Sequence, residues 1–386
     1  MYSSTALLAE FSISETRGFL PSTDPIDRLS HHFDAWEDAA HGLPKLLMSD
    51  DVRSLLSALP EFPIDRLGDE REWKRAMSIL SYLGHAYVWG GYRPATHLPA
   101  RLAVPWHQVA TKLGRPPVLS YGSYCFDNWY RFDKNRDPEL GNIGLIQNFL
   151  AGEDEEWFIL VHVDIEFNAA RGVNSLLAAQ DSVGDPATLQ GHLEVISESL
   201  KKMYATMLRM PQRCDPYIYY HRVRPFIHGW KNHPDLPNGL VYEGVEAYNG
   251  VPQQFRGETG AQSAIIPCMD AALGVFHDPD ELKTYLLEMR TYMPPEHRKF
   301  LETLESRPSI REYVLSQGSE SLTAVYNECL HGVEIFRSLH LEYAATYIFK
   351  QAQTDPKNPH AVGTGGTPFM RYLKKHRDET AEHSVR

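Results

Sequence analysis

The sequence predicts a protein of the all-α class, built from a small N-terminal helical unit and a larger C-terminal one. Apolar residues recur at steps of three and four along most of the chain, which is the period of an α-helix. Strand-like runs are short, and Ala264-Ile265-Ile266 is an example. The polar stretch 131–142 separates two regions of helical periodicity, so we interpret it as the crossing between the two units.

Three segments show the helical pattern most clearly. In each of them the apolar residues trace one face of a helix. The third segment stops at Pro294-Pro295, because proline lacks the amide hydrogen that continues a helix. The apolar positions are Trp73, Met77, Leu80, Leu83 and Tyr87 in the first segment, Leu189, Leu193, Ile196, Leu200, Met203 and Met207 in the second, and Leu282, Leu286, Met289 and Met293 in the third.

Proline and glycine punctuate three long stretches that we expect to be irregular, at 92–117, 232–260 and 353–368. Between the first of them and a helix near Phe158 lies the polar crossing, so we place the boundary between the units near residue 148. The predicted domains are therefore 1–148 and 149–386. The last dozen residues are rich in charge, and we expect them to be loosely helical.

Composition and charge narrow the function classes. The formal net charge of −12 argues against a nucleic-acid surface, which needs clustered Lys and Arg, so the expected partner is a small molecule. The sequence has no apolar run of roughly 20 residues, the length that crosses a bilayer. The N-terminal stretch lacks a basic leader and has acidic Glu10 and Glu15, from which we expect a cytoplasmic protein. The four cysteines have no CxxC spacing, which fits reduced thiols.

The strongest helical pattern of the C-terminal half runs from about Leu322 to Lys350 and carries His340 on its apolar stripe. The stripe residues Val333 and Phe336 precede His340 by seven and four positions, and Ala344 and Tyr347 follow it by four and seven. A histidine on such a face is more often a hydrogen-bonded core residue than a ligand. Spacing alone leaves both interpretations open.

Arg337 lies one helical turn before His340, within reach of an acidic group on any planar cofactor bound there. An imidazole that is the sole protein ligand of a haem iron leaves the opposite axial position open for O2. The sequence has no CxxCH motif, so a haem would be held without covalent bonds.

Several blocks of sequence resemble indoleamine 2,3-dioxygenases, and they occur in the family's order over nearly the whole chain. The C-terminal blocks are RPFIHGWKNHPDLPNGLVYEGV at 224–245, EMRTYMPPEHRKFLETLESRPSIREYVLS at 288–316, FRSLHLEYAATYI around His340 and GTGGTPFMRYLKK at 363–375. The N-terminal blocks are SETRGFLP, AYVWG, LPARLAVPWHQV and PPVLSYGSYCFDNW.

The resemblance implies an all-helical, two-domain protein with haem b bound between the small N-terminal and the large C-terminal domain, and with His340 as the proximal iron ligand. It implies insertion of O2 across the indole C2–C3 bond of L-tryptophan or a related indoleamine. The product would be N-formylkynurenine, in tryptophan catabolism through the kynurenine pathway. An electron donor would keep the iron ferrous.

The resemblance also assigns groups that would hold the substrate's polar ends. Arg224 matches the family arginine that binds the substrate carboxylate, which suits a planar guanidinium fork. Arg222 and Arg224 differ by about 200° on a helix, so only one of them need face the pocket. The glycine-rich loop with Gly363 and Thr364 matches a lid whose hydroxyl contacts the substrate, although its composition equally fits a flexible linker.

The resemblance places Tyr121, Phe158 and Tyr219 around the distal pocket, where aromatic rings can enclose an indole. Two positions depart from the mammalian pattern. Tyr219 replaces a phenylalanine and Tyr124 replaces a small residue. His162 falls at a distal position if EEWFILVHVDIEF aligns without a gap, and it could then accept the indole N–H. A shifted alignment would remove it from the site.

Asp270 and Arg337 match a family acid and arginine near the haem propionates, a pairing that is otherwise an ordinary buried ion pair. Glu258, Thr259 and Gly260 fall in the loop over the distal side, where relatives have small residues, so Glu258 is unexpected. Two alternatives stay open: a haem enzyme of the same superfamily that acts on a substituted tryptophan in secondary metabolism, and a haem-binding sensor without catalysis.

Overall fold

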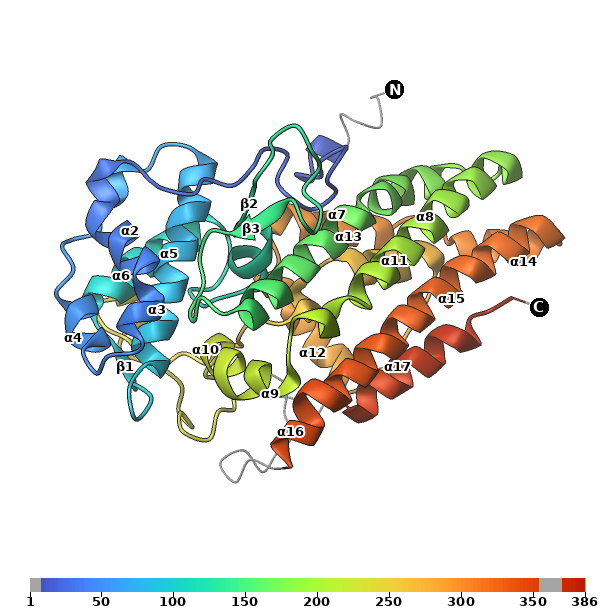
Figure 1. The fold of residues 1–386 in the computed structure, drawn as a ribbon. Coiled ribbons are helices and arrows are strands. Elements are labelled where there is room, and N and C mark those ends of the chain that lie inside the picture. Colours follow the sequence, from blue (N-terminus) through green and yellow to red (C-terminus); the bar gives the residue numbers. More distant parts are fainter. Residues whose placement is uncertain (1–7, 354–369, 386) are drawn as a thin grey trace.

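The computed structural model describes residues 8–353 and 370–385, and most of this chain is helical, which confirms the predicted all-α class. Figure 1 shows helices α2 to α6 gathered at one end and the long helices α7, α8 and α15 at the other. The helices are α2 Asp34–His41, α3 Leu43–Leu46, α4 Val52–Ser57, α5 Glu70–Trp89, α6 Ala100–Lys112, α7 Glu153–Asp181, α8 Pro186–Met207, α9 Pro216–Ile218, α10 Arg224–Ile227, α11 Ile265–Leu273, α12 Glu281–Met289, α13 Pro295–Glu305, α14 Ile310–Gln317, α15 Glu320–Tyr343, α16 Lys350–Ala352 and α17 Met370–Glu382.

Two small sheets of two strands each join the helices. β1 His97–Leu98 pairs in parallel with β4 Val241–Tyr242, and β2 Trp129–Arg131 pairs antiparallel with β3 Ile143–Leu145. The second sheet is formed around the polar stretch 131–142. The predicted crossing between the two helical units is therefore a hairpin, in which Trp129 lies opposite Leu145.

Local capping explains where the long helices begin. Asp69, Asp185 and Ser319 each precede a long helix, and each side chain accepts a hydrogen bond from a backbone N–H of the first turn. Helix α7 begins instead with four acidic residues, 153–156, and negative charge next to the positive end of the helix dipole stabilises the helix. The helices predicted from 73–87, 189–207 and 322–350 are confirmed as α5, α8 and α15 with its continuation.

Two predictions about local structure were wrong. Ala264-Ile265-Ile266 is not strand-like, because Ile265 begins helix α11. The stretch 92–117, predicted to be irregular, contains helix α6 with Pro105 inside it. Leu102, Trp106 and Val109 are completely buried on one face of α6, so burial of apolar surface outweighs the hydrogen bond that Pro105 removes.

The first described residues pack on the C-terminal helices rather than on α2 to α6. The rings of Phe11 and Phe300 lie 5.3 Å apart, and the amide of Asn174 donates to the carbonyl oxygen of Ser14. The predicted domain boundary near residue 148 stays a prediction. The four cysteines, Cys125, Cys214, Cys268 and Cys329, are buried and form no disulfide.

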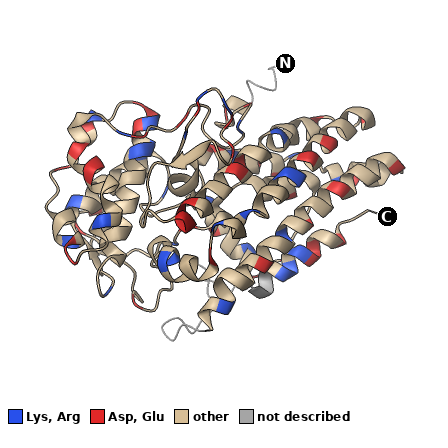
Figure 2. Ribbon diagram, in the orientation of Figure 1, with Lys and Arg blue, Asp and Glu red and all other residues tan. Residues whose placement is uncertain are grey.

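Three turns of the wider π-helix type interrupt the regular helices: η3 Gly122–Phe126, η5 Tyr219–Val223 and η9 Ala344–Phe349. The last continues α15 directly after the turn that carries His340. Figure 2 shows basic and acidic residues mixed along the helices at both ends of the molecule. No helix among the described residues is long and apolar enough to cross a membrane.

Candidate functional site

His340 lies in the last turn of α15, with buried Val333 and Tyr347 on the same helical stripe. Its side chain is accessible to solvent-sized molecules, yet burial within the protein lowers its pKa to about 4. The His340 ring is thus exposed at its surface, while enough protein surrounds it to disfavour its charged form. None of the hydrogen bonds among the described residues involves the His340 ring, so the interpretation as a hydrogen-bonded core residue is not supported.

His162, on α7, lies near enough to His340 that its charge lowers the pKa of His340 further. The Nδ1 of His162 is 2.7 Å from the carbonyl oxygen of Phe158, one turn earlier. Because a carbonyl only accepts, Nδ1 carries the proton and Nε2 is left as an acceptor. The structure thus brings His162 near His340, and its role in a distal pocket stays a prediction.

Four aromatic residues form a cluster beside His162, and Phe158 is at its centre. Phe158 contacts His162, Tyr219 and Tyr124, with ring centroids 4.6, 4.5 and 6.4 Å apart. The Tyr121 ring meets His162 edge-on at 6.0 Å. Tyr121 and Tyr124 belong to the π-turn η3 and the residue before it, and Tyr219 begins the π-turn η5. The structure brings together all the predicted pocket aromatics.

Two polar groups face the same aromatic cluster. The Tyr124 hydroxyl is buried and has no hydrogen-bond partner. Glu258 is 3% exposed, and burial raises its pKa to about 8. Burial raises the pKa values of Tyr121, Tyr124 and Tyr219, and the charge of Glu258 raises them further, so its carboxyl group lies near enough to act on these phenols. Glu258 therefore points inward, although a small residue was expected at this position.

Backbone contacts between two loops hold Glu258 in place. The Glu258 N–H donates to the carbonyl oxygen of Ile227 at 3.1 Å. A Cβ added to Gly229 would lie 2.2 Å from the amide nitrogen of Gly257, so only glycine permits this approach. The next residue, Thr259, accepts a hydrogen bond from the backbone of Ala261, and Gly260 is exposed. Thr259 thus shapes the loop, and Gly260 lies at its surface.

Arg224, the first residue of α10, is 2% exposed, whereas Arg222 is exposed. The structure therefore turns Arg224 inward and Arg222 outward, and the role of Arg224 in a pocket stays a prediction. Its guanidinium lies 5.0 Å from the ring centroid of Tyr220. Burial lowers the pKa of Arg224, and the neighbouring Tyr219 and Tyr220 partly oppose that effect.

Arg337 and Asp270 form a bidentate ion pair, with nitrogen–oxygen distances of 3.1 and 2.5 Å. Arg337 also contacts Thr380 of α17 and the Nε2 of His277, at 3.2 Å from the latter. The predicted pairing is present, one turn from His340. Gly363 and Thr364 lie outside the described residues.

Three features of this region were not predicted from the sequence. Glu166, on α7, accepts a hydrogen bond from Ser263 at 2.6 Å and interacts with the Tyr121 hydroxyl, and burial raises its pKa to about 7. The π-turns and the cluster of His277, His376 and Glu379 also went unnoticed. Only the spacing of three between His376 and Glu379 on one helix face was visible in the sequence.

Two open hollows of about 480 and 340 Å³ lie between the N-terminal segment, the start of α5 and neighbouring loops. The larger one reaches Pro295 of α13 and shares Phe126 with the wall behind Tyr121. Neither hollow is lined by a predicted site residue. The chemistry of the site therefore rests on the residues around His340 and His162.

Comparison with known proteins gives consistent matches along the chain. The family model described as indoleamine 2,3-dioxygenase matches residues 7–383. Indoleamine 2,3-dioxygenase 1 of Rattus norvegicus is 35% identical, over 98% of this chain and 95% of the relative. Indoleamine 2,3-dioxygenase 2 of Homo sapiens is 35% identical, over 97% and 95%. Indoleamine 2,3-dioxygenase of Saccharomyces cerevisiae is 34% identical, over 97% and 93%.

The inward carboxyl group of Glu258 generates a prediction about stability and pH. Its pKa is 4.5 in an unfolded chain and about 8 in the folded protein, so folding takes up a proton between these values. The free energy of unfolding should therefore fall as the pH rises through this window. Burial lowers the pKa of His85 and His340 to about 4, so these histidines change the free energy of unfolding only below about pH 6.5.

We expect Glu258→Gln to remove about 1–2 kcal/mol of the decrease in unfolding free energy between pH 6.5 and 8. Urea unfolding at several pH values measures this difference. The exposed Glu156, on α7, provides the control Glu156→Gln, which should leave the pH profile unchanged. If the profiles of Glu258→Gln and the unmodified chain coincide, Glu258 is not buried as described.

Proposed function

Because the chain belongs to the indoleamine 2,3-dioxygenase family, we propose that it uses haem b and O2 to open the pyrrole ring of L-tryptophan or a related indoleamine. The product would be N-formylkynurenine. The observation that carries this proposal is that His340 lies near His162, and that His162 belongs to a cluster of aromatic rings with Tyr121, Phe158 and Tyr219. The chain is an oxidoreductase of the indoleamine/tryptophan 2,3-dioxygenase type.

The residues around His340 fit a haem. His340 offers an imidazole that has no hydrogen bond within the described chain and whose low pKa keeps it neutral, as iron ligation requires. Arg337 and Asp270 lie one turn away, and the arginine can approach a haem propionate. When bound, haem supplies the iron at which O2 is activated, and an electron donor keeps that iron ferrous.

The chain's own residues then bind and orient the substrate. Arg224 is buried and planar, so it can bind the carboxylate through two parallel hydrogen bonds. The rings of Phe158, Tyr121 and Tyr219 enclose the indole and exclude water. The bare Nε2 of His162 accepts the indole N–H. Gly363 and Thr364 are proposed to close over the substrate.

The experiment that tests this function uses the full chain reconstituted with haem, a reductant, L-tryptophan and labelled ¹⁸O2. We expect mass spectrometry to find both labelled oxygen atoms in one product molecule. Arg224→Leu should lower kcat/KM by roughly a hundredfold, because a buried charged hydrogen bond to the carboxylate is lost. The exposed Arg222 gives the control Arg222→Leu, which should retain activity.

Other outcomes would point to different chemistry. A product with one labelled atom would indicate a monooxygenase. If tryptophan and its analogues neither shift the haem spectrum nor are consumed, the chain is a haem-binding sensor, and this outcome would overturn the proposal.

One observation favours a second candidate substrate, a tryptophan with a polar substituent on its benzene ring. Tyr124 carries a buried hydroxyl without a partner, and Glu258 lies beside it. Burial raises the pKa values of Tyr82, on α5, and Cys125, in η3, and the charge of Glu258 raises both further. A hydroxyl on the indole could bond to the Tyr124 hydroxyl, which has no partner when the ring is unsubstituted, and it would lie near the Glu258 carboxyl group.

We therefore expect Tyr124→Phe and Glu258→Gln each to lower the preference for hydroxylated tryptophan over L-tryptophan by roughly three- to tenfold. The measurement is the ratio of kcat/KM values for the two substrates. Tyr326→Phe is the matched control, since Tyr326 is also buried but bonds to Leu273, away from this cluster. An unchanged ratio in both pocket variants would exclude this specificity.

A further inference from the structure

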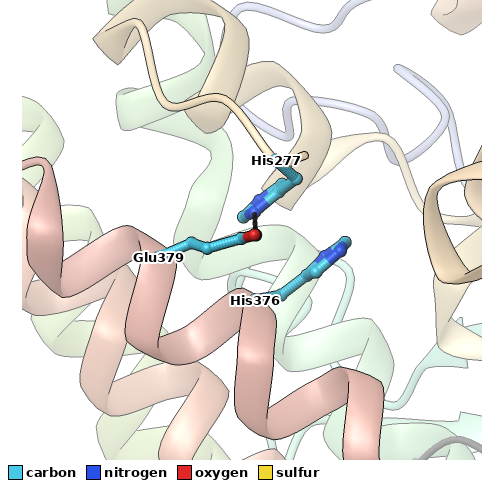
Figure 3. Close-up of side chains that lie close together, drawn as sticks. All are labelled: His277, His376 and Glu379. Carbon is cyan, nitrogen blue, oxygen red and sulfur yellow. Dashed lines mark hydrogen bonds and ion pairs between the residues drawn. The ribbon is translucent and has the colours of Figure 1, made fainter. Parts of the chain in front are cut away.

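Three potential metal ligands meet where helix α17 packs near the loop between α11 and α12. His277 belongs to that loop, and His376 and Glu379 lie three residues apart on one face of α17. Each offers one ligand atom, and these atoms lie within 4.8 Å of one another. We call these residues the C-terminal histidine cluster. Figure 3 shows the Glu379 carboxylate next to the His277 ring, with the His376 ring on the same side of α17.

The C-terminal histidine cluster is buried enough to exclude bulk water. The side chains of His277, His376 and Glu379 are 10%, 4% and 14% exposed. The Nε2 of His376 has no hydrogen-bond partner, which is unfavourable for a buried polar atom. The Nδ1 of His277 is 2.7 Å from the Glu379 carboxylate. The Nε2 of His376 is therefore available to a metal, and the other two ligand atoms, on His277 and Glu379, already face each other.

The charges around the cluster permit a cation. Arg337 lies 3.2 Å from the Nε2 of His277, but Asp270 neutralises it as a bidentate partner. Lys375 lies 3.2 Å from Glu379, and Asp280 pairs with it at 2.8 Å. With both pairs neutral, Glu379 leaves one net negative charge at the site.

We propose that His277, His376 and Glu379 bind a zinc ion, which nothing in the chain's dioxygenase chemistry requires. Two imidazoles and one carboxylate form a donor set that zinc accepts, with water as the fourth ligand. Asp270 lies 3.5 Å from the Nε2 of His277. Once Nδ1 binds the metal, Nε2 carries the proton and donates it to Asp270, the arrangement in which a carboxylate orients a metal-bound histidine.

Zinc binding requires a defined rearrangement of the cluster. The two imidazole rings are parallel, with an interplanar angle of 1° and centroids 3.8 Å apart. A metal lies in the plane of each ring that binds it, so one ring must rotate about its Cβ–Cγ bond. The ligand atoms must also approach to about 3.3 Å, the spacing of a tetrahedral zinc site. The ring of His376 can rotate without breaking a hydrogen bond at Nε2.

Metal binding at the cluster would change the contacts of Arg337, which touches His277. The Nε2 of His277 now accepts from Arg337, and this contact is lost when the nitrogen becomes protonated. Zinc would therefore fasten α17 to the loop after α11 and leave Arg337 on Asp270 alone. Because Arg337 precedes His340 by one turn, metal binding would act on the helix that carries the proposed haem ligand.

The test is titration of the full chain with zinc, followed by calorimetry, and with cobalt, followed by its visible absorption. We expect one metal ion per chain at this site and the intense visible bands of tetrahedral cobalt. His376→Gln and Glu379→Gln should each weaken zinc binding by at least about tenfold, because a direct ligand is lost. Circular dichroism checks that each variant is folded.

Two controls locate the bound metal. The exposed His331 lies outside the cluster, so His331→Gln should bind zinc as the unmodified chain does. His340→Gln should also retain the site, whether or not the chain takes up haem. Loss of zinc binding in His340→Gln, unchanged affinity in the cluster variants, or no stoichiometric binding by the unmodified chain would overturn the proposal.

Discussion

The arrangement of the site depends on one interaction, the iron ligation that the His340 imidazole is left able to make. This ring is exposed and has no hydrogen-bond partner among the described residues, while the protein around it lowers its pKa to about 4 and keeps it neutral. A neutral imidazole without a partner can ligate iron. Helix α15 can hold the ring there because its apolar stripe continues beyond His340 to Tyr347, which bonds to Cys214 at 2.7 Å.

The π-turns supply the surrounding groups. Turn η3 carries Tyr124, turn η5 begins with Tyr219 and ends directly before Arg224, and η9 begins one turn after His340. A π-turn shifts the following residues around the helix axis, so neighbouring positions reach directions that a regular helix would separate. The turns η3 and η5 thus help aromatic rings from distant segments to meet Phe158, which contacts His162.

The sequence predicts those parts of the molecule that follow from periodicity or from one helix. The helical period predicts that His340 and Arg337 lie one turn apart on α15, and the angle between Arg222 and Arg224 anticipates that only one is buried. Helix α6 escaped prediction because Pro105 resembles a helix end. The π-turns leave no trace in composition, since they change only the hydrogen-bond register. The pairing of His277 with Glu379 joins residues 102 positions apart, which no local pattern reveals.

The inward direction of Glu258 also could not be read from the sequence, because it follows from two loops packed backbone to backbone at Gly229 and Gly257. The central claim concerns His340, and the most direct measurement is a haem titration followed by the Soret absorption. Haem should bind tightly to the unmodified chain and to His331→Ala, and weakly to His340→Ala until imidazole is added. Tight binding by His340→Ala with the spectrum of the unmodified chain would contradict the account.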